Sequence, residues 1–179
     1  MDALLFFCRL IDALSDHVGK LAKWAAFAAC LISAGNAVSR YVFDYSSNAW
    51  LEIQWYLFAT AVMMGAARVY RLNEHVRVDV LYGRLSGRSQ ACVDLFGIAC
   101  FLLPVMALLA WLSAPLLADM IRTQETSSNA GGLIRWPAML MLPLGFAMMF
   151  VQGLSEAIKR VAWLMNRYEM PQQYERPLQ

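Results

Sequence analysis

The residue best placed to do chemistry in this sequence is Glu52, which lies in a long apolar stretch beside Gln54 and Trp55. Charged side chains are costly inside a bilayer, so a carboxylate there usually has a partner or a function. One interpretation makes Glu52 the partner of a basic group on another helix, or part of a proton or ion path. The other makes it a carboxylate near the membrane surface, favoured by the positive end of its own helix or held in a structural pairing. The sequence alone leaves both open.

Few other polar groups in the apolar stretches suggest chemistry. Asn36 and Gln152 carry amides suited to hydrogen bonds across helices. The two histidines, His17 and His75, lie outside these stretches, which excludes a haem held by two intramembrane histidines. No H-E-x-x-H, G-x-S-x-G or phosphate-loop motif occurs, and the four cysteines form no C-x-x-C pair. We therefore expect neither an enzyme nor a bound cofactor.

The elements that must position these residues are helices in a membrane. The chain is 60% hydrophobic and 16% charged over 179 residues, with a mean hydropathy of +0.46, whereas soluble domains are about 45–50% apolar and about 25% charged. The excess falls in four blocks, each long enough to cross about 30 Å of hydrocarbon, and helices alone satisfy their backbone there. These predicted spans are approximately residues 21–38, 50–69, 93–117 and 136–157. Pro104 and Pro143 predict kinks in the last two.

The basic residues predict the orientation. Twelve Lys and Arg residues lie in the N-terminal segment, the middle loop and the C-terminal end, and three lie in the other two loops. By the positive-inside rule, both termini are then cytoplasmic. We expect an all-α membrane protein with a four-helix domain over residues 21–160 and a cytoplasmic tail over residues 161–179. The basic residues flank apolar spans and form no stripe with interleaved aromatics, so a nucleic-acid partner is not expected.

Residues 1–20 have the pattern of an amphipathic helix. One face is mainly apolar, with Leu4, Phe7, Cys8, Ile11, Leu14 and Val18, and the other carries Arg9, Asp12, Asp16 and Lys20. Such a pattern favours a helix that lies in the membrane interface. The alternative is an extension of the first span.

The first span carries small residues four positions apart. The two rows are Ala22, Ala26, Cys30, Ala34 and Ala25, Ala29, Ser33, Ala37. Small residues at this spacing let another helix approach closely. That helix belongs either to a partner or to this chain's own bundle.

Several short segments, taken in order, carry a family resemblance. Residues 74–80 read Glu-His-Val-Arg-Val-Asp-Val in the loop between the second and third spans. With their surroundings they resemble the small membrane subunit, of the DctQ type, of tripartite ATP-independent periplasmic (TRAP) transporters. Further similar segments are residues 49–56, 65–67, 125–137 and 142–146. The likeness extends over roughly residues 21–160, and the order of the segments on a four-helix frame is more specific than any one of them.

The resemblance implies a division of labour. In such systems a soluble periplasmic protein captures an organic acid or similar solute, and a large multi-span subunit performs sodium-coupled transport. The small subunit binds the large one as a scaffold in a bacterial or archaeal inner membrane. No substrate-binding residue is then expected in this chain, and Glu52 is the best candidate for an interaction that joins helices, with Trp55 and Asn36 as further candidates at a subunit interface.

Arg77 and Asp79 belong to the segment of residues 74–80 that carries the resemblance. Matching the family pattern, they would fix the cytoplasmic loop, and pairing with each other is one way to do so, since residues i and i+2 share a face in an extended segment. Alternatively, both are solvated charges that contribute about 0–1 kcal/mol.

Two other readings remain. The chain could be a stand-alone homodimeric four-helix exporter with Glu52 as its proton-coupled site, which predicts transport without a partner. It could also be the membrane anchor of another complex. A coupling carboxylate is expected nearer the midplane than Glu52, and this favours the scaffold.

Overall fold

The described part of the chain is almost entirely helical. The structure is a computed structural model, which describes residues 2–74 and 82–169. Arg77, Asp79 and the tail after residue 169 lie outside the described residues. The helices are α1 (Asp2–Phe43), α2 (Asn48–Arg71), α4 (Gly87–Gly97), the π-helical turn η1 (Ile98–Leu102), α5 (Leu103–Thr123) and α6 (Trp136–Leu164). Each of the four apolar blocks lies inside one helical stretch.

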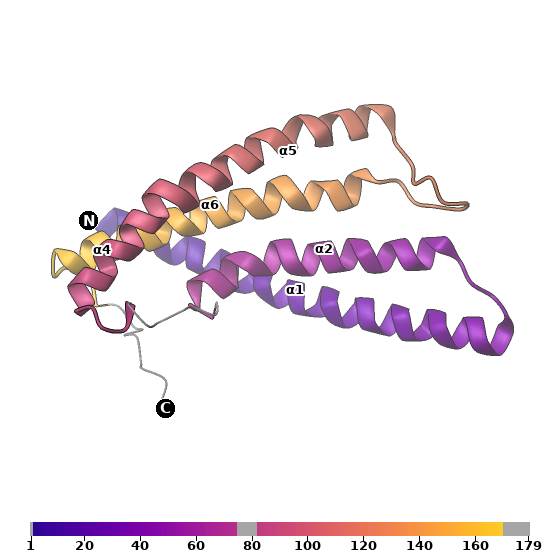
Figure 1. The fold of residues 1–179 in the computed structure, drawn as a ribbon, viewed down its shortest axis with the longest axis horizontal. Coiled ribbons are helices and arrows are strands. Elements are labelled where there is room, and N and C mark those ends of the chain that lie inside the picture. The colour runs from indigo at the N-terminus through magenta and orange to yellow at the C-terminus, as the bar shows by residue number, and fades with distance from the viewer. Residues whose placement is uncertain (1, 75–81, 170–179) are drawn as a thin grey trace.

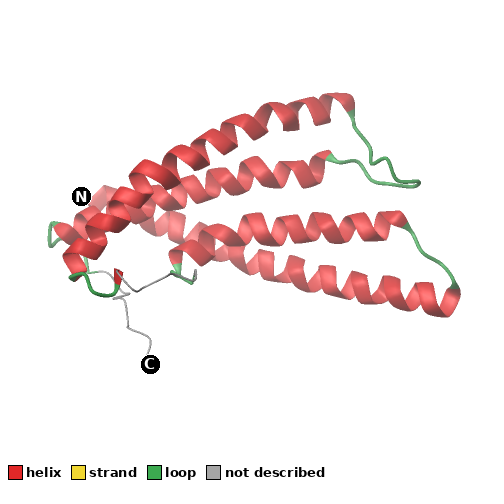
Figure 2. Cartoon of the chain, in the orientation of Figure 1, coloured by secondary structure: helices red, strands yellow, loops and turns green. Residues whose placement is uncertain are grey.

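The helices form two antiparallel hairpins, α1 with α2 and α5 with α6 (Figure 1). Helix α6 contacts each of the other helices that the structure describes, α1 included, so it is the element that joins the hairpins. The hairpins draw apart toward the two loops at the far end of the bundle, which Figure 2 shows in green. At the other end, the start of α1 lies beside the end of α6, which α4 also contacts. The fold therefore has a tight end and a splayed end.

The exterior of the bundle is apolar. Trp111 is 78% exposed and Phe101 is 62% exposed, whereas the buried positions are mostly small or polar residues. Soluble proteins rarely expose large apolar surfaces, and a bilayer removes their cost. Among the described residues, three helical stretches are long and apolar enough to cross a membrane: α1, the continuous stretch from α4 to α5, and α6. Helix α2 is not among them; it carries Glu52, Gln54 and several aromatic residues that lower its hydropathy.

The N-terminal segment differs from the expected separate surface helix. It is continuous with the first span, and the 42 residues of α1 extend about 63 Å at 1.5 Å per residue. The expected apolar face is divided, since Cys8 and Ile11 are buried while Phe7 and Leu14 are exposed. The reason is that α6 offers polar groups to this segment, so the side that packs inward includes the fully buried Ser15.

A π-helical turn precedes Pro104. It spans Ile98–Leu102 and is continuous with α4 and α5 on either side. Proline lacks an N–H and its ring crowds the preceding turn, so one wider turn accommodates it without ending the helix. The kink expected at Pro104 therefore takes the form of a local widening of the helix.

Glycines allow α6 to pack closely against its neighbours. A Cβ added at Gly145 of α6 would lie 2.8 Å from the Met63 side chain and 2.9 Å from its backbone oxygen on α2. A Cβ added at Gly153 would lie 2.7 Å from Leu102. At these two positions α6 approaches α2 on one side and η1 on the other, which fits its role as the central helix.

Candidate functional site

Glu52 holds the α5–α6 loop onto α2. Its side chain accepts a hydrogen bond from the backbone N–H of Leu133 at 2.6 Å and another from the Asn129 side-chain amide at 2.9 Å. The residue is only 3% exposed. Hydrogen bonds to an ionised acceptor are stronger than those between neutral groups. The carboxylate is therefore engaged by neutral donors of the loop at the splayed end of the bundle.

The loop has the geometry of a small hairpin. Thr126 and Ile134 form an isolated antiparallel bridge, and Gly131 has a φ of 71°, which favours glycine. A Cβ added at Gly132 would lie 3.0 Å from the Glu52 carboxylate and 2.6 Å from Ser127. The lack of a side chain at Gly132 thus lets the loop backbone come close to Glu52.

Two further side chains of α2 bind the same loop. Asn48 donates to the backbone oxygen of Ala130 at 3.0 Å, and the Tyr56 hydroxyl donates to the backbone oxygen of Ile134 at 2.9 Å. Together with Glu52 they form the outer latch: Asn48, Glu52 and Tyr56 on α2, binding residues 129–134. The latch joins the two hairpins where the helices themselves draw apart.

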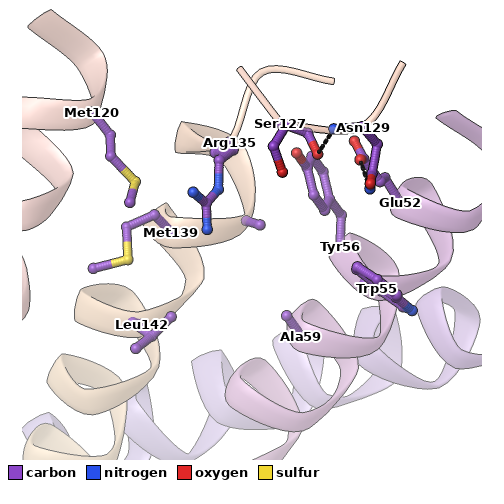
Figure 3. Close-up of a pocket in the computed structure, with 12 residues that line it drawn as sticks. Glu52, Trp55, Tyr56, Ala59, Met120, Ser127, Asn129, Arg135, Met139 and Leu142 are labelled. Atoms are coloured by element: carbon purple, nitrogen blue, oxygen red, sulfur yellow. Dashed lines mark hydrogen bonds between the residues drawn. The ribbon is translucent and has the colours of Figure 1, made fainter. Parts of the chain in front are cut away.

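A pocket of about 470 Å³ lies beside the outer latch, between α2, α5 and α6 (Figure 3). Met120, Met139 and Leu142 line it from α5 and α6, and Ala59 lines it from α2. Its polar groups come mainly from the loop and from Arg135, which lies where α6 begins. Figure 3 shows the side chain of Arg135 on the same side as the two methionines.

The tight end of the bundle contains a buried polar cluster between α1 and α6. The hydroxyl of Ser15 donates to the oxygen of the fully buried Gln152 amide at 2.7 Å. The nitrogen of that amide donates to Asp12 at 2.9 Å, and the Ser155 hydroxyl donates to Asp12 at 3.3 Å. Both polar atoms of Gln152 are therefore satisfied, as buried polar groups require.

Charged residues extend this cluster toward the end of α6. Lys159 contacts Asp12 at 3.0 Å and Glu156 at 2.5 Å, and only 9% of its side chain is exposed. Arg160 contacts Glu156 at 2.7 Å and Asp94 at 3.2 Å. We call these five residues, Asp12, Asp94, Glu156, Lys159 and Arg160, the inner charge network. It ties α1 and α4 to α6.

A second ion-pair group joins α1 to α2. Arg68 and Arg71 both donate to the carboxylate of Asp16, with 3.3 Å between Arg68 Nε and Asp16 Oδ1. Asp16 was expected to be on a polar face of the N-terminal helix, and the structure places this carboxylate against α2. Pairings of this kind join residues more than fifty positions apart in the sequence, so no local spacing could have indicated them.

The predicted site residues are distributed over different parts of the bundle. Glu52 lies in the outer latch, and Trp55, 66% exposed, lines the pocket beside it. Asn36 is half-buried near the far end of α1. Sequence reasoning missed the inner charge network. The sequence feature that could have indicated it is the spacing of Glu156, Lys159 and Arg160, which places these residues on one side of α6.

These features define an all-helical, multi-pass membrane protein whose described polar clusters join its own helices. Comparison with family models identifies it further. Residues 19–162 match the family described as tripartite ATP-independent periplasmic transporters, DctQ component, and the chain belongs to this family. No curated protein and no solved structure matches the chain significantly. The resemblance found in the sequence is thereby confirmed, and the family is a transporter component, not an enzyme family.

Proposed function

We propose that this chain is the small scaffold subunit of a TRAP transporter. It binds a large multi-span membrane subunit and supports sodium-coupled uptake of an organic acid or similar solute delivered by a periplasmic binding protein. The observation that carries the proposal is that the polar groups of this chain bind one another. Glu52 is engaged by the loop, and Asp12, Glu156 and Lys159 bind one another. These groups hold helices together, which suits a rigid static subunit.

Helix α2 is proposed as a fourth span, in a bacterial or archaeal inner membrane with both termini in the cytoplasm. Its 24 residues extend about 36 Å, enough to cross about 30 Å of hydrocarbon. It also runs antiparallel to α1, so its ends lie at opposite ends of the bundle. The inner charge network and the Asp16 ion pairs share the tight end, where the basic residues gather, and this end is assigned to the cytoplasm.

Cysteine labelling in intact cells tests this orientation. In a background without the four native cysteines, Ser46→Cys should react with a membrane-impermeant maleimide added outside. Arg84→Cys should react only after the inner membrane is opened, because α2 separates the two positions. Both residues are exposed, so access depends on the side of the membrane. Labelling of both from the same side would contradict α2 as a span.

A face of α1 is proposed as the contact with the large subunit. The first part of the small-residue rows on α1 packs within the chain. Its residue Ala22 is buried, and the Ala22 side chain lies 3.6 Å from the position that a Cβ on Gly65 of α2 would take. The later part, Cys30, Ser33, Ala34 and Ala37, is exposed. Small exposed residues let a partner helix approach closely, with the half-buried Asn36 available for a hydrogen bond.

Copurification tests this proposal. The tagged chain, extracted from its native membrane in mild detergent, should bring with it one large, very apolar polypeptide identified by mass spectrometry. Ala34→Trp should reduce the recovery of that polypeptide several-fold, because the indole prevents close helix approach. Ala118→Trp, at an exposed position of α5, serves as the matched control and should leave recovery unchanged. Equal recovery with both variants would exclude this face of α1.

A further inference from the structure

The pocket beside the outer latch has the composition of a site for an amphipathic molecule. Its deeper lining is apolar and comes from α2, α5 and α6, and its polar groups lie at the end formed by the loop. Its volume of about 470 Å³ falls in the range of ligand sites, about 300–1,000 Å³. A ligand that fits has an apolar portion directed along the helices and one polar end beneath the loop.

The apolar portion of the pocket suits a flexible chain. Met120 and Met139 face the space from neighbouring helices, and unbranched thioether side chains adapt to irregular shapes. Ala59 and Ala138 contribute only methyl groups, which leaves the space between the hairpins open. Figure 3 shows Ala59 and Leu142 below the loop, on opposite sides of this space.

The polar end of the pocket favours a phosphate. Arg135 lines it with 53% of its side chain exposed, and one nitrogen of the guanidinium contacts Glu125 at 2.5 Å. A guanidinium has five N–H donors, so it can bind a phosphate while keeping that contact. Glu52 also lines the pocket, but its carboxylate accepts bonds from Asn129 and Leu133 of the loop.

We propose that this pocket holds a phospholipid of the outer leaflet, with an acyl chain between Ala59 and Met139 and its phosphate at Arg135. The leaflet follows from the proposed orientation, which places the loop end outside. The surroundings indicate which molecule occupies the pocket. Phe58 is 64% exposed and Leu116 is 57% exposed on the same helices, so this part of the bundle faces the hydrocarbon of the bilayer. Lipid is therefore the ligand that surrounds the pocket. The lipid fills the gap that the separating hairpins leave and supports the outer latch.

Photo-crosslinking of the complex tests the proposal. The complex is reconstituted into vesicles of phosphatidylethanolamine and phosphatidylglycerol that contain a phosphatidylethanolamine with a diazirine near the end of one acyl chain. Cross-links are mapped by mass spectrometry. We expect them to concentrate on residues lining the pocket, chiefly Met120, Met139 and Leu142. Cross-links spread evenly over the exposed faces of α1 and α5 would overturn the proposal, as would a helix of the large subunit found in the pocket.

Three variants identify the pocket and the phosphate contact. Ala59→Phe fills the space from α2 and Met120→Trp fills it from α5, and each should reduce pocket cross-linking several-fold. Arg135→Gln should reduce the amount of phospholipid that remains bound after detergent washing, while Arg122→Gln, at an exposed arginine paired with Asp119, should not. Unchanged cross-linking in both space-filling variants, each recovered in an intact complex, would overturn the proposal.

Discussion

Lys159→Met should lower the free energy of unfolding by about 3–5 kcal/mol, the usual cost of removing one partner from a buried ion pair. Lys159 contacts both Asp12 and Glu156 and is 8% exposed. Methionine matches much of its volume but leaves two carboxylates close together without the cation between them. The expected result is a lower unfolding midpoint when the purified chain is titrated with SDS in mild detergent micelles.

The control for this prediction is an ion pair of similar chemistry at an exposed site. Arg122 and Asp119 are 3.2 Å apart on α5, with side chains 83% and 63% exposed. Arg122→Met should cost only about 0–1 kcal/mol. Adding Asp12→Asn to Lys159→Met should cost less than the sum of the two single changes, because the residues interact directly. Additive effects, or equal effects at Lys159 and Arg122, would show that the inner charge network does not stabilise the bundle.

Glu52→Ala should release the loop of residues 124–135 from α2. Two donors, the Leu133 N–H and the Asn129 amide, then lose their acceptor. We expect the backbone amides of Ser127, Leu133 and Arg135, all hydrogen-bonded in the native loop, to exchange with deuterium about tenfold faster or more, since local opening becomes easier. Hydrogen–deuterium exchange with mass spectrometry of the purified complex measures this.

Glu125→Ala is the matched control for the loop. Glu125 lies in the same loop, and its side chain forms a partly exposed pair with Arg135. Its removal should change amide exchange little, because exposed pairs contribute little. If Glu52→Ala left exchange of the loop at the native rate, the outer latch would depend on Asn48 and Tyr56 instead.

Hydropathy and spacing predicted the helical class and the approximate positions of the helices. Long apolar blocks can satisfy their backbone in a membrane only as helices, so composition was sufficient. The ends were harder to predict: α1 and α6 continue well beyond their apolar blocks, because residues such as Asp12 and Lys159 neutralise each other inside the bundle. A hydropathy pattern counts such charges as ends of a span.

The site was predictable in part. Glu52 was identified because an isolated carboxylate in an apolar stretch requires a partner, but the nature of that partner was open. The structure supplies a backbone N–H and an amide from the loop, about eighty residues away in the sequence. The contacts of Gln152 with Asp12 and Ser15 could not be derived either, because they depend on how α1 crosses α6. Arg77 and Asp79 remain predictions.

Polar contacts at opposite ends of the bundle fit the proposed role of a rigid support. The inner charge network fastens α1, α4 and α6 at one end, and the outer latch fastens the hairpins at the other. Between them, small residues such as Gly145 let α6 pack closely against α2. In the proposed role, the apolar exterior of the bundle would face lipid and the large subunit.

Reconstituted transport tests whether this chain is a scaffold or a carrier. Vesicles are prepared with this chain alone, with its large membrane partner alone, and with both, and uptake driven by a sodium gradient is measured in the presence of the periplasmic binding protein. If the chain is a scaffold, we expect uptake with both membrane subunits and none with this chain alone. Uptake by this chain alone, lost in Glu52→Gln, would contradict the scaffold role and establish a stand-alone carrier.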